Sequence, residues 1–470
     1  MSRHAAIARA QAYFDSGEFR ADLARRVAFR TESQVPESRP HLARYLETEI
    51  APAFARMGYR TILMPNPVAD AGPYLIATRH EDASLPTVLS YGHGDVIRGL
   101  EGQWRDGLDP WTLTVEGERW YGRGTADNKS QHLINMLALE HVIAVRGHLG
   151  FNSVFMIESS EEIGSPGLDS FCAAHRSLLA GDILIGSDGP RLQPDRPTIF
   201  GGTRGALNFD LVVDLREGGH HSGNWGGLLA NPAVILANAI AAIIDAKGRI
   251  GARALVPASI PNSVRHALAG AEIEGGADGP EVDTWWGEPG LTPAERVFAW
   301  NTFEVLTLHA GNPQTPVNAV PPRARAHCQI RFTTDVPWKT LIPSLRAFLD
   351  SRGFHGVAII PSRQEIMTAT RLDPDHPAAH WAIESLRQTT GKEPALLPSL
   401  GGSLPNACFT DTLGMPTVWV PHSYAACSQH APNEHVLAPL MREGLAMMTG
   451  MFWDMGYTPP PFPRGDLVQR

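Results

Sequence analysis

Short apolar runs alternate with helix-like stretches as far as residue 190 of this 470-residue chain, and this alternation restricts the fold more than any other feature. A long helix is predicted over residues 130–146. Strands are predicted for the runs at residues 60–64, 74–78, 87–91, 153–157 and 183–186. Strands that alternate with helices form a sheet with helices on both faces, so the sequence predicts an α/β fold.

Two adjacent carboxylates, Glu161 and Glu162, follow the predicted strand at 153–157. On a continuing strand they would point to opposite faces, but in the loop after a strand both can reach one cleft. Such a pair suits a metal site in which one carboxylate is a ligand and its neighbour acts as a base. An isolated Glu-Glu pair is more often a solvated turn, so the rest of the chain has to decide between these interpretations.

Further ligand-type residues stand in turns next to predicted elements. His93 and Asp188 each follow a strand, Asp127 precedes the long helix, and His430 follows an apolar run near the end of the chain. Ligand sites of α/β sheets lie beyond the carboxyl ends of the strands, so these residues can gather at one edge. Imidazole and carboxylate together suit zinc, cobalt or manganese. Residue types and spacing alone favour a metal site and ordinary polar turns equally.

Composition excludes several classes of function. The net charge is −9 and no long basic run is present, which argues against nucleic acid as a partner. The four cysteines are far apart, which fits a reducing compartment. The N-terminus lacks the apolar core of a signal peptide, and the longest helix-like apolar stretch, 233–246, is too short to cross a bilayer. We therefore predict a cytoplasmic protein without membrane contact.

The pattern of elements changes after residue 190. A stretch rich in Pro and Asp at 191–197 indicates a domain boundary. A small α/β domain is predicted from strands at 206–214, 324–333 and 357–360 and from helices at 231–246 and 337–351. We predict a catalytic domain whose first part is 1–199 and second part is 369–470, with the small domain inserted at 200–368.

Six motifs resemble those of the M20 metallopeptidases, the family that contains the carnosinase-type dipeptidases, acetylornithine deacetylase and succinyl-diaminopimelate desuccinylase. The matching stretches, in the family's order, are Gly92–Val96, Gly122–Lys129, Glu161–Ser165, His221–Gly223, Gly401–Pro405 and His430–Glu434. The resemblance implies a mixed-sheet catalytic domain with helices on both faces and an inserted small α/β domain that serves as lid and dimerisation domain.

The resemblance also implies two divalent metal ions per subunit, with zinc preferred and cobalt or manganese as alternatives. By similarity, Asp127 bridges the ions, His93 and Asp188 complete one site, and Glu162 and His430 complete the other. A second set of expectations concerns the surroundings of these ligands. Glu161 matches the family's general base, Asp95 is placed to hold the other nitrogen of the His93 ring, and the peptide bond Asp127–Asn128 is expected to be cis.

The remaining expectations concern substrate and partner. By similarity, His221 reaches into the partner subunit's site of a homodimer and stabilises the oxyanion, while Arg331 binds a substrate carboxylate together with Gly402 and Ser403. Asn318 matches a lid position near the substrate. On local sequence alone, His221 fits a loop or helix-capping histidine better, and Arg331 fits a solvated strand residue equally well.

We therefore predict a two-metal hydrolase that cleaves the amide bond of a dipeptide or a similar small amide bearing a carboxylate. A hydroxide that bridges the metals would attack the carbonyl, and Glu161 would act as the base. One alternative is an N-acyl-amino-acid deacylase of the acetylornithine or succinyl-diaminopimelate type. The alternative from another class is a non-catalytic binding protein on a degenerate hydrolase fold.

Overall fold

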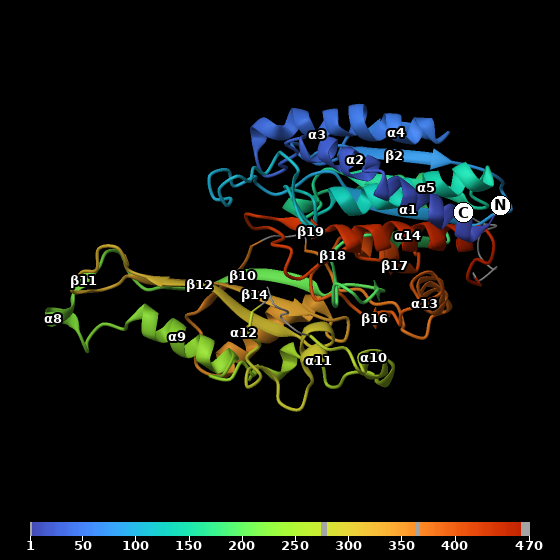
Figure 1. The fold of residues 1–470 in the computed structure, drawn as a ribbon. Coiled ribbons are helices and arrows are strands. Elements are labelled where there is room, and N and C mark those ends of the chain that lie inside the picture. The colour runs from blue at the N-terminus through green and yellow to red at the C-terminus, as the bar shows by residue number, and fades with distance from the viewer. Residues whose placement is uncertain (1, 274–279, 363–365, 462–470) are drawn as a thin grey trace.

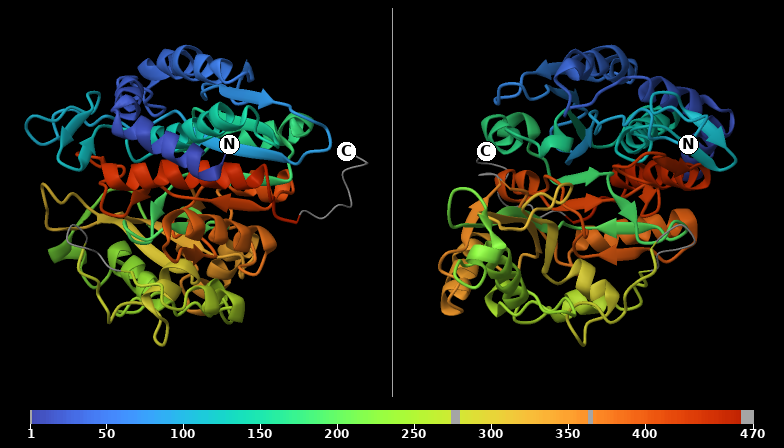
Figure 2. Two further views of the ribbon diagram at one scale, coloured as in Figure 1. Left: turned by 45° about the vertical axis from the view of Figure 1, so that its right-hand side comes forward. Right: turned by 90° about the vertical axis from the view of Figure 1, so that its left-hand side faces the viewer.

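The computed structural model describes residues 2–273, 280–362 and 366–461. Two main sheets organise these residues: a large sheet shared by both ends of the chain, and a smaller one built from the stretch between them (Figure 1). In both views of Figure 2 the segments from the two chain ends, blue and red, lie together on one side, and the green and yellow segments lie on the other. The predicted α/β architecture with an inserted lid is confirmed.

The large sheet has eight strands in the order β1-β2-β6-β3-β7-β17-β9-β16. It is mixed: β6, β3, β7 and β17 run parallel, whereas β1 and β2 pair antiparallel at one side. The strands are β1 Arg60–Met64, β2 Tyr74–Arg79, β3 Thr87–His93, β6 Asn152–Glu158, β7 Ile183–Gly186, β9 Thr198–Phe200, β16 Ala395–Leu397 and β17 Thr417–Trp419. The predicted strands at 60–64 and 183–186 match β1 and β7 at both ends.

Successive side chains of the central strands enter two different cores, because a strand points alternate residues to opposite faces. In β6, Phe155 and Ile157 pack with the helices from both chain ends, whereas Val154 and Met156 pack on the opposite face with Phe171 of α6. The helices around this sheet are α1 Arg3–Asp15, α2 Glu18–Val27, α3 Arg39–Tyr45, α4 Ala51–Arg56, α5 Lys129–Arg146, α6 Leu168–Ala174, α7 Arg176–Leu179, α13 Pro377–Thr390 and α14 Ala438–Met455.

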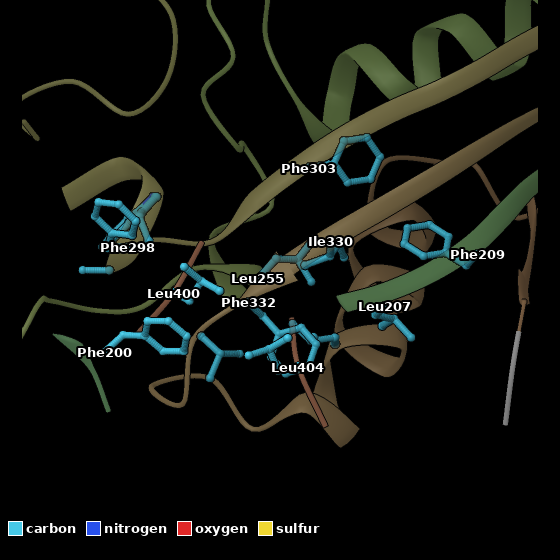
Figure 3. Close-up of a cluster of buried hydrophobic side chains, with 14 of the residues drawn as sticks. Phe200, Leu207, Phe209, Leu255, Phe298, Phe303, Ile330, Phe332, Leu400 and Leu404 are labelled. Atoms are coloured by element: carbon cyan, nitrogen blue, oxygen red, sulfur yellow. The ribbon is translucent and has the colours of Figure 1, made fainter. Parts of the chain in front are cut away.

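The lid sheet is antiparallel, in the order β12-β14-β10-β15. Its strands are β10 Gly205–Asp214, β12 Thr302–Ala310, β14 Arg323–Phe332 and β15 Ala358–Pro361. One face packs on helices through a core that includes Phe209, Phe303 and Ile330 (Figure 3). The helices of this part are α9 Pro232–Ile243, α10 Asn262–Ala267, α11 Pro293–Phe298 and α12 Leu341–Ser351. The sequence analysis predicted three strands here and missed β12, which lies at the edge of the sheet.

Three small sheets, two of two strands and one of three, complete the described structure. Strands β11 His220–His221 and β13 Ala319–Val320, far apart in the chain, form a two-stranded antiparallel ribbon, and the short helix α8 Ser222–Trp225 follows β11 at the far end of the lid (Figure 1). The other strands are β4 Thr114–Glu116, β5 Arg119–Tyr121, β8 Pro190–Arg191, β18 Ser423–Tyr424 and β19 His435–Leu437. Among the described residues, no helix combines the length and apolar character needed to cross a membrane.

Candidate metal centre and active site

The candidate ligands come from strand ends of the large sheet and from loops, and His430 lies in the loop between β18 and β19. His93 is the last residue of β3, and Asp188 follows β7. Glu161 and Glu162 lie in a 3-10 turn two residues beyond β6. Asp127 stands just before α5, and the peptide bond from Asp127 to Asn128 is cis, as the resemblance implied. Parallel strands end at the same edge, so residues distant in the chain arrive together.

The ligand atoms form two groups that share Asp127. In the first group, His93 Nε2 lies 2.9 Å from Asp127 Oδ1 and 3.6 Å from Asp188 Oδ2. In the second group, His430 Nε2 lies 3.0 Å from Asp127 Oδ2 and 3.1 Å from Glu162 Oε2. Within each group the ligand atoms all lie within 4.8 Å of one another. The structure thus brings together all five residues expected to hold metal ions, with one Asp127 oxygen toward each group.

The electrostatics of the five side chains fit divalent cations. Burial, followed by the charge of Asp127, raises the pKa of Glu162 to about 7 and that of Asp188 to about 6. Hydrogen bonds with Asp127 and Glu162 raise the pKa of His430 to about 11. Asp188 Oδ2 is buried and accepts no hydrogen bond from any described residue. These acidic oxygens are crowded together, and one of them has no hydrogen-bond donor among the described residues. Such a group of ligand atoms is completed by a positive charge, such as a divalent cation.

Asp95 connects this centre to the acidic turn. The His93 ring Nδ1 lies 3.0 Å from the Asp95 carbonyl oxygen and 3.5 Å from its carboxylate, so the carbonyl is the nearer partner. The carboxylate instead accepts hydrogen bonds from the backbone N–H groups of Glu161 and Glu162, at 3.2 and 3.1 Å. One buried side chain therefore fixes the position of the turn that carries both glutamates.

Glu161 lines the same cavity as the ligand groups but belongs to neither of them. Its side chain makes no hydrogen bond to any described residue. Burial raises the pKa of its carboxyl group well above the usual range; the positive charge of His93 opposes this rise, and the charge of Glu162 adds to it. A carboxyl group with a raised pKa next to a metal centre is suited to accept and return a proton.

The cavity extends from the ligand groups to the lid and has a volume of about 960 Å³. Arg331, Gly402 and Ser403 line its other end. Arg331 Nη1 donates a hydrogen bond to Ser403 Oγ at 2.9 Å. The structure therefore places the residues expected to bind a carboxylate in one cavity with the ligand groups.

His221 and Asn318 lie elsewhere in this chain. His221 is exposed on the two-stranded ribbon of β11 and β13 at the far end of the lid, where its Nδ1 accepts a hydrogen bond from the Gly223 backbone. Asn318 is exposed nearby, and its carbonyl oxygen accepts a hydrogen bond from the Ser222 backbone. Neither residue lines the cavity of its own chain.

Sequence reasoning missed the part played by Glu434. This fully buried carboxylate accepts hydrogen bonds from the backbone of Gly124, Ala126 and Asp127 at 2.8–3.1 Å, and Arg123 pairs with it at 2.8 Å. It thereby ties the loop of His430 to the loop of the shared ligand Asp127. The motif around His430 contained Glu434, but no local pattern shows that its partners lie some 300 residues earlier.

A mixed sheet with a lid, and paired His and carboxylate ligands at the strand ends, defines a class of metal-dependent hydrolases. Residues 89–454 match the sequence model described as Peptidase family M20/M25/M40. The chain belongs to this family, and it is a metal-dependent peptidase.

Several known proteins are similar to the chain. A cysteinylglycine-S-conjugate dipeptidase of Corynebacterium striatum is 25% identical over 352 residues, which cover 72% of this chain and 74% of that protein. The β-Ala-His dipeptidase of Mus musculus is 34% identical over 182 residues, 38% of this chain and 36% of that protein. The crystal structure of an M20 family metallo-carboxypeptidase from Sulfolobus solfataricus has a TM-score of 0.80 at 23% identity, covering 93% and 99% of the two chains, and so shows the shared fold.

Proposed function

We propose that the protein is a two-metal dipeptidase. The observation that carries this proposal is a single cavity with two different ends. One end has two ligand groups that share Asp127, and Glu161 lies beside them; the other end has Arg331, which is available for a carboxylate. A dipeptide has an amide bond and a terminal carboxylate separated by one residue. The relatives named as dipeptidases support the same substrate class.

Five residues would hold the metal ions: His93 and Asp188 in one group, Glu162 and His430 in the other, and Asp127 in both. When bound, such ions lower the pKa of water toward neutrality and polarise a carbonyl group. The mixed nitrogen and oxygen donors favour zinc, with cobalt and manganese as alternatives.

Glu161 would handle the proton of the reaction. Its carboxylate would accept a proton from the attacking water and return it to the leaving amine. Its raised pKa supports this role, since a carboxyl group that titrates nearer neutrality both takes and gives a proton more readily. Asp95 would keep the Glu161 backbone in place through the hydrogen bond to its N–H group.

Arg331 would bind the terminal carboxylate of the substrate, with Gly402 and Ser403. No carboxylate of the described residues lies within ion-pair distance of Arg331; its hydrogen bonds go to the neutral side chains of Gln329 and Ser403. Within the described residues, no group accepts a hydrogen bond from the backbone N–H groups of Gly402 and Ser403. A charged guanidinium and free amides in one cavity are a site for a carboxylate.

The proposal includes a homodimer formed through the lid. The edge strand β12 exposes the apolar side chains of Val305, Leu306 and Leu308 by 37%, 50% and 57%. An edge with unpaired backbone groups and exposed apolar side chains is suited to pair with another strand. In such a dimer the exposed ribbon of β11 and β13, with His221 and Asn318, would be available to the partner's cavity. A cytoplasmic location stays a prediction from the sequence.

A substrate panel tests the proposed function. The purified protein is assayed with zinc, cobalt or manganese against dipeptides, the same dipeptides with an amidated C-terminus, and N-acetyl and N-succinyl amino acids. The proposal expects the highest kcat/KM for a dipeptide with a free carboxylate. Faster cleavage of the N-acyl amino acids would show that the protein is an N-acyl-amino-acid deacylase instead. No turnover of any compound would favour the alternative of a non-catalytic binding protein.

A further inference from the structure

The face of the lid sheet that borders the cavity carries a continuous row of polar side chains. On β14, His327, Gln329 and Arg331 point to this face, because every second residue of a strand shares a side. On the neighbouring β10, Asn208 pairs with Gln329 and Asp210 pairs with His327. Arg331, Asn208 and His327 line the cavity directly. The register of two strands thus places five polar groups side by side, which we call the lid row.

Hydrogen bonds connect the lid row from end to end. Arg331 Nε donates to Gln329 Oε1 at 3.0 Å, and Gln329 Nε2 donates to Asn208 Oδ1 at 2.9 Å. The Asn208 amide nitrogen then lies 3.4 Å from His327 Nε2. The His327 ring reaches the acid at the end of the row, because its Nδ1 lies 2.9 Å from Asp210 Oδ1.

The two ends of the lid row dictate the direction of every bond. Arginine has only donors, so Gln329 has to offer Arg331 its oxygen. The hydrogen bond from Arg325 lowers the pKa of Asp210, which therefore stays an ionised acceptor and requires a proton on His327 Nδ1. Between these ends, each amide and the imidazole has one orientation in which every contact along the row joins a donor to an acceptor. The row holds Gln329 with its oxygen toward Arg331.

Both side chains that hold Arg331 are neutral. Gln329 accepts from its Nε and Ser403 accepts from its Nη1. Ser403 Oγ in turn donates to the Arg204 carbonyl oxygen at 2.6 Å, so this anchor is also fixed. A carboxylate in the place of Gln329 would orient the guanidinium equally well but would cancel its charge. The observed arrangement fixes the direction of Arg331 and leaves its charge for another anion.

We propose that Gln329 is a positioning residue for substrate recognition: as a neutral acceptor locked by the lid row, it aims Arg331 at the terminal carboxylate of the substrate without neutralising it. This inference rests on the proposed function, in which Arg331 binds that carboxylate. It identifies a specificity determinant that acts through Arg331 and touches neither the substrate nor the metal ligands.

Two substitutions at one position separate this role from a structural one. Gln329→Ala removes the acceptor, and Gln329→Glu keeps an acceptor but adds a charge. Each variant is assayed with the best dipeptide of the panel and with the same dipeptide amidated at its C-terminus. Arg323→Gln, an exposed residue at the start of β14, is the matched control. Thermal unfolding and metal content are measured for every variant.

We expect Gln329→Ala to raise KM for the free dipeptide on the order of tenfold, the effect of losing one hydrogen bond to a charged group. The value of kcat should change less than about twofold, because the metal ligands are untouched. Gln329→Glu should raise this KM further, since its carboxylate pairs with Arg331. The KM of the amidated dipeptide should stay at the wild-type value in both variants, and Arg323→Gln should match the wild type throughout.

A wild-type KM for the free dipeptide in Gln329→Glu would overturn the inference, because a merely structural acceptor tolerates that change. Equal losses for the free and amidated dipeptides would also overturn it. Arg331→Ala distinguishes a failure of the inference from a failure of the proposed function. If Arg331→Ala raises KM only for the free dipeptide and the Gln329 variants leave that KM unchanged, the inference about Gln329 alone fails. If Arg331→Ala changes KM equally for the free and the amidated dipeptide, the proposed recognition of the carboxylate by Arg331 fails as well.

Discussion

The two ends of the cavity are built in different ways. At the metal end the side chains are ionisable and crowded, and they come from the last residue of β3 and from loops. At the recognition end, Arg331 comes from a lid strand and is held by neutral groups. The proposed function assigns cation binding and chemistry to the crowded groups, and selection of the ligand to Arg331, which neutral side chains orient. Under the proposed function, catalysis and selectivity fall to separate parts of the fold, so changes at the two ends should affect different kinetic constants.

Removal of the metal ions should have the largest effect, because it abolishes the function of one end entirely. A chelator should eliminate turnover and lower the midpoint of thermal unfolding, since ligands that bind only the folded state stabilise it. Zinc, cobalt or manganese added back should restore both. An enzyme that stays fully active after exhaustive chelation, verified by elemental analysis, would contradict the proposed role of this end.

The pH dependence of metal binding follows from the same cluster. The pKa of His430 is raised to about 11 and that of Glu162 to about 7, so near pH 7 the metal-free ligands hold protons that metal binding must displace. Metal ligands must be deprotonated, so binding releases protons and the apparent affinity should increase from pH 6 to pH 8. Titration calorimetry in two buffers of different ionisation enthalpy measures this release. A heat that is independent of the buffer would refute it.

Glu161→Gln should lower kcat by about 10²- to 10⁴-fold, the usual contribution of a general base. Glutamine has nearly the same shape but takes no proton at neutral pH, and Glu161 belongs to neither ligand group. Metal content and KM should therefore stay near the wild-type values. Glu116→Gln, at an exposed strand residue, is the control. A Glu161→Gln enzyme with wild-type kcat would show that another group moves the proton.

The Glu434→Gln variant should weaken metal binding by about 10- to 100-fold, the range found when partners behind metal ligands are changed. The amide provides one acceptor oxygen where the carboxylate provides two, and the Asp127 loop needs both. Glu443→Gln is a matched control, because Glu443 also pairs with a buried arginine, Arg191, but belongs to neither ligand loop. Equal metal affinity in both variants and the wild type would exclude a role for Glu434 in holding the ligands.

A substitution at the edge of the lid sheet should have the smallest effect on the reaction within one chain, because it changes the proposed dimer contact and not the cavity. Leu308→Lys should raise the dissociation constant of the dimer at least about tenfold, because a buried lysine replaces an apolar contact. Ile62→Lys is the control: Ile62 is 50% exposed on β1, an edge strand of the other sheet. Sedimentation velocity over a dilution series measures the shift. A wild-type protein that is monomeric at all concentrations would end the proposal of a lid dimer.

The sequence allowed prediction of the features that depend on local pattern and on motifs. The strands before Glu161 and Asp188 are continuous apolar runs, and they appear as β6 and β7. The predicted helix at 130–146 appears as α5, which begins one residue earlier, at Lys129. β12 was missed because its residues after Phe303 are exposed, so apolar and polar residues do not alternate there as they do in a half-buried strand.

Contacts between distant segments were beyond sequence reasoning. The partners of Glu434 lie on a loop 307 to 311 positions earlier. The lid row depends on the pairing of Asn208 with Gln329, and a shift of one residue would turn these side chains to the opposite face. A single sequence contains no signal for such a register. These long-range contacts are the ones that hold Asp127 and Arg331 in position.

The most direct test of the central claim is the number of metal ions bound per chain, measured by elemental analysis after dialysis. Asp127 is the only residue common to both ligand groups found among the described residues. The account predicts two equivalents of divalent metal for the wild-type protein and less than one for Asp127→Ala. Two equivalents retained by Asp127→Ala, or one or none bound by the wild type at saturating metal, would contradict it.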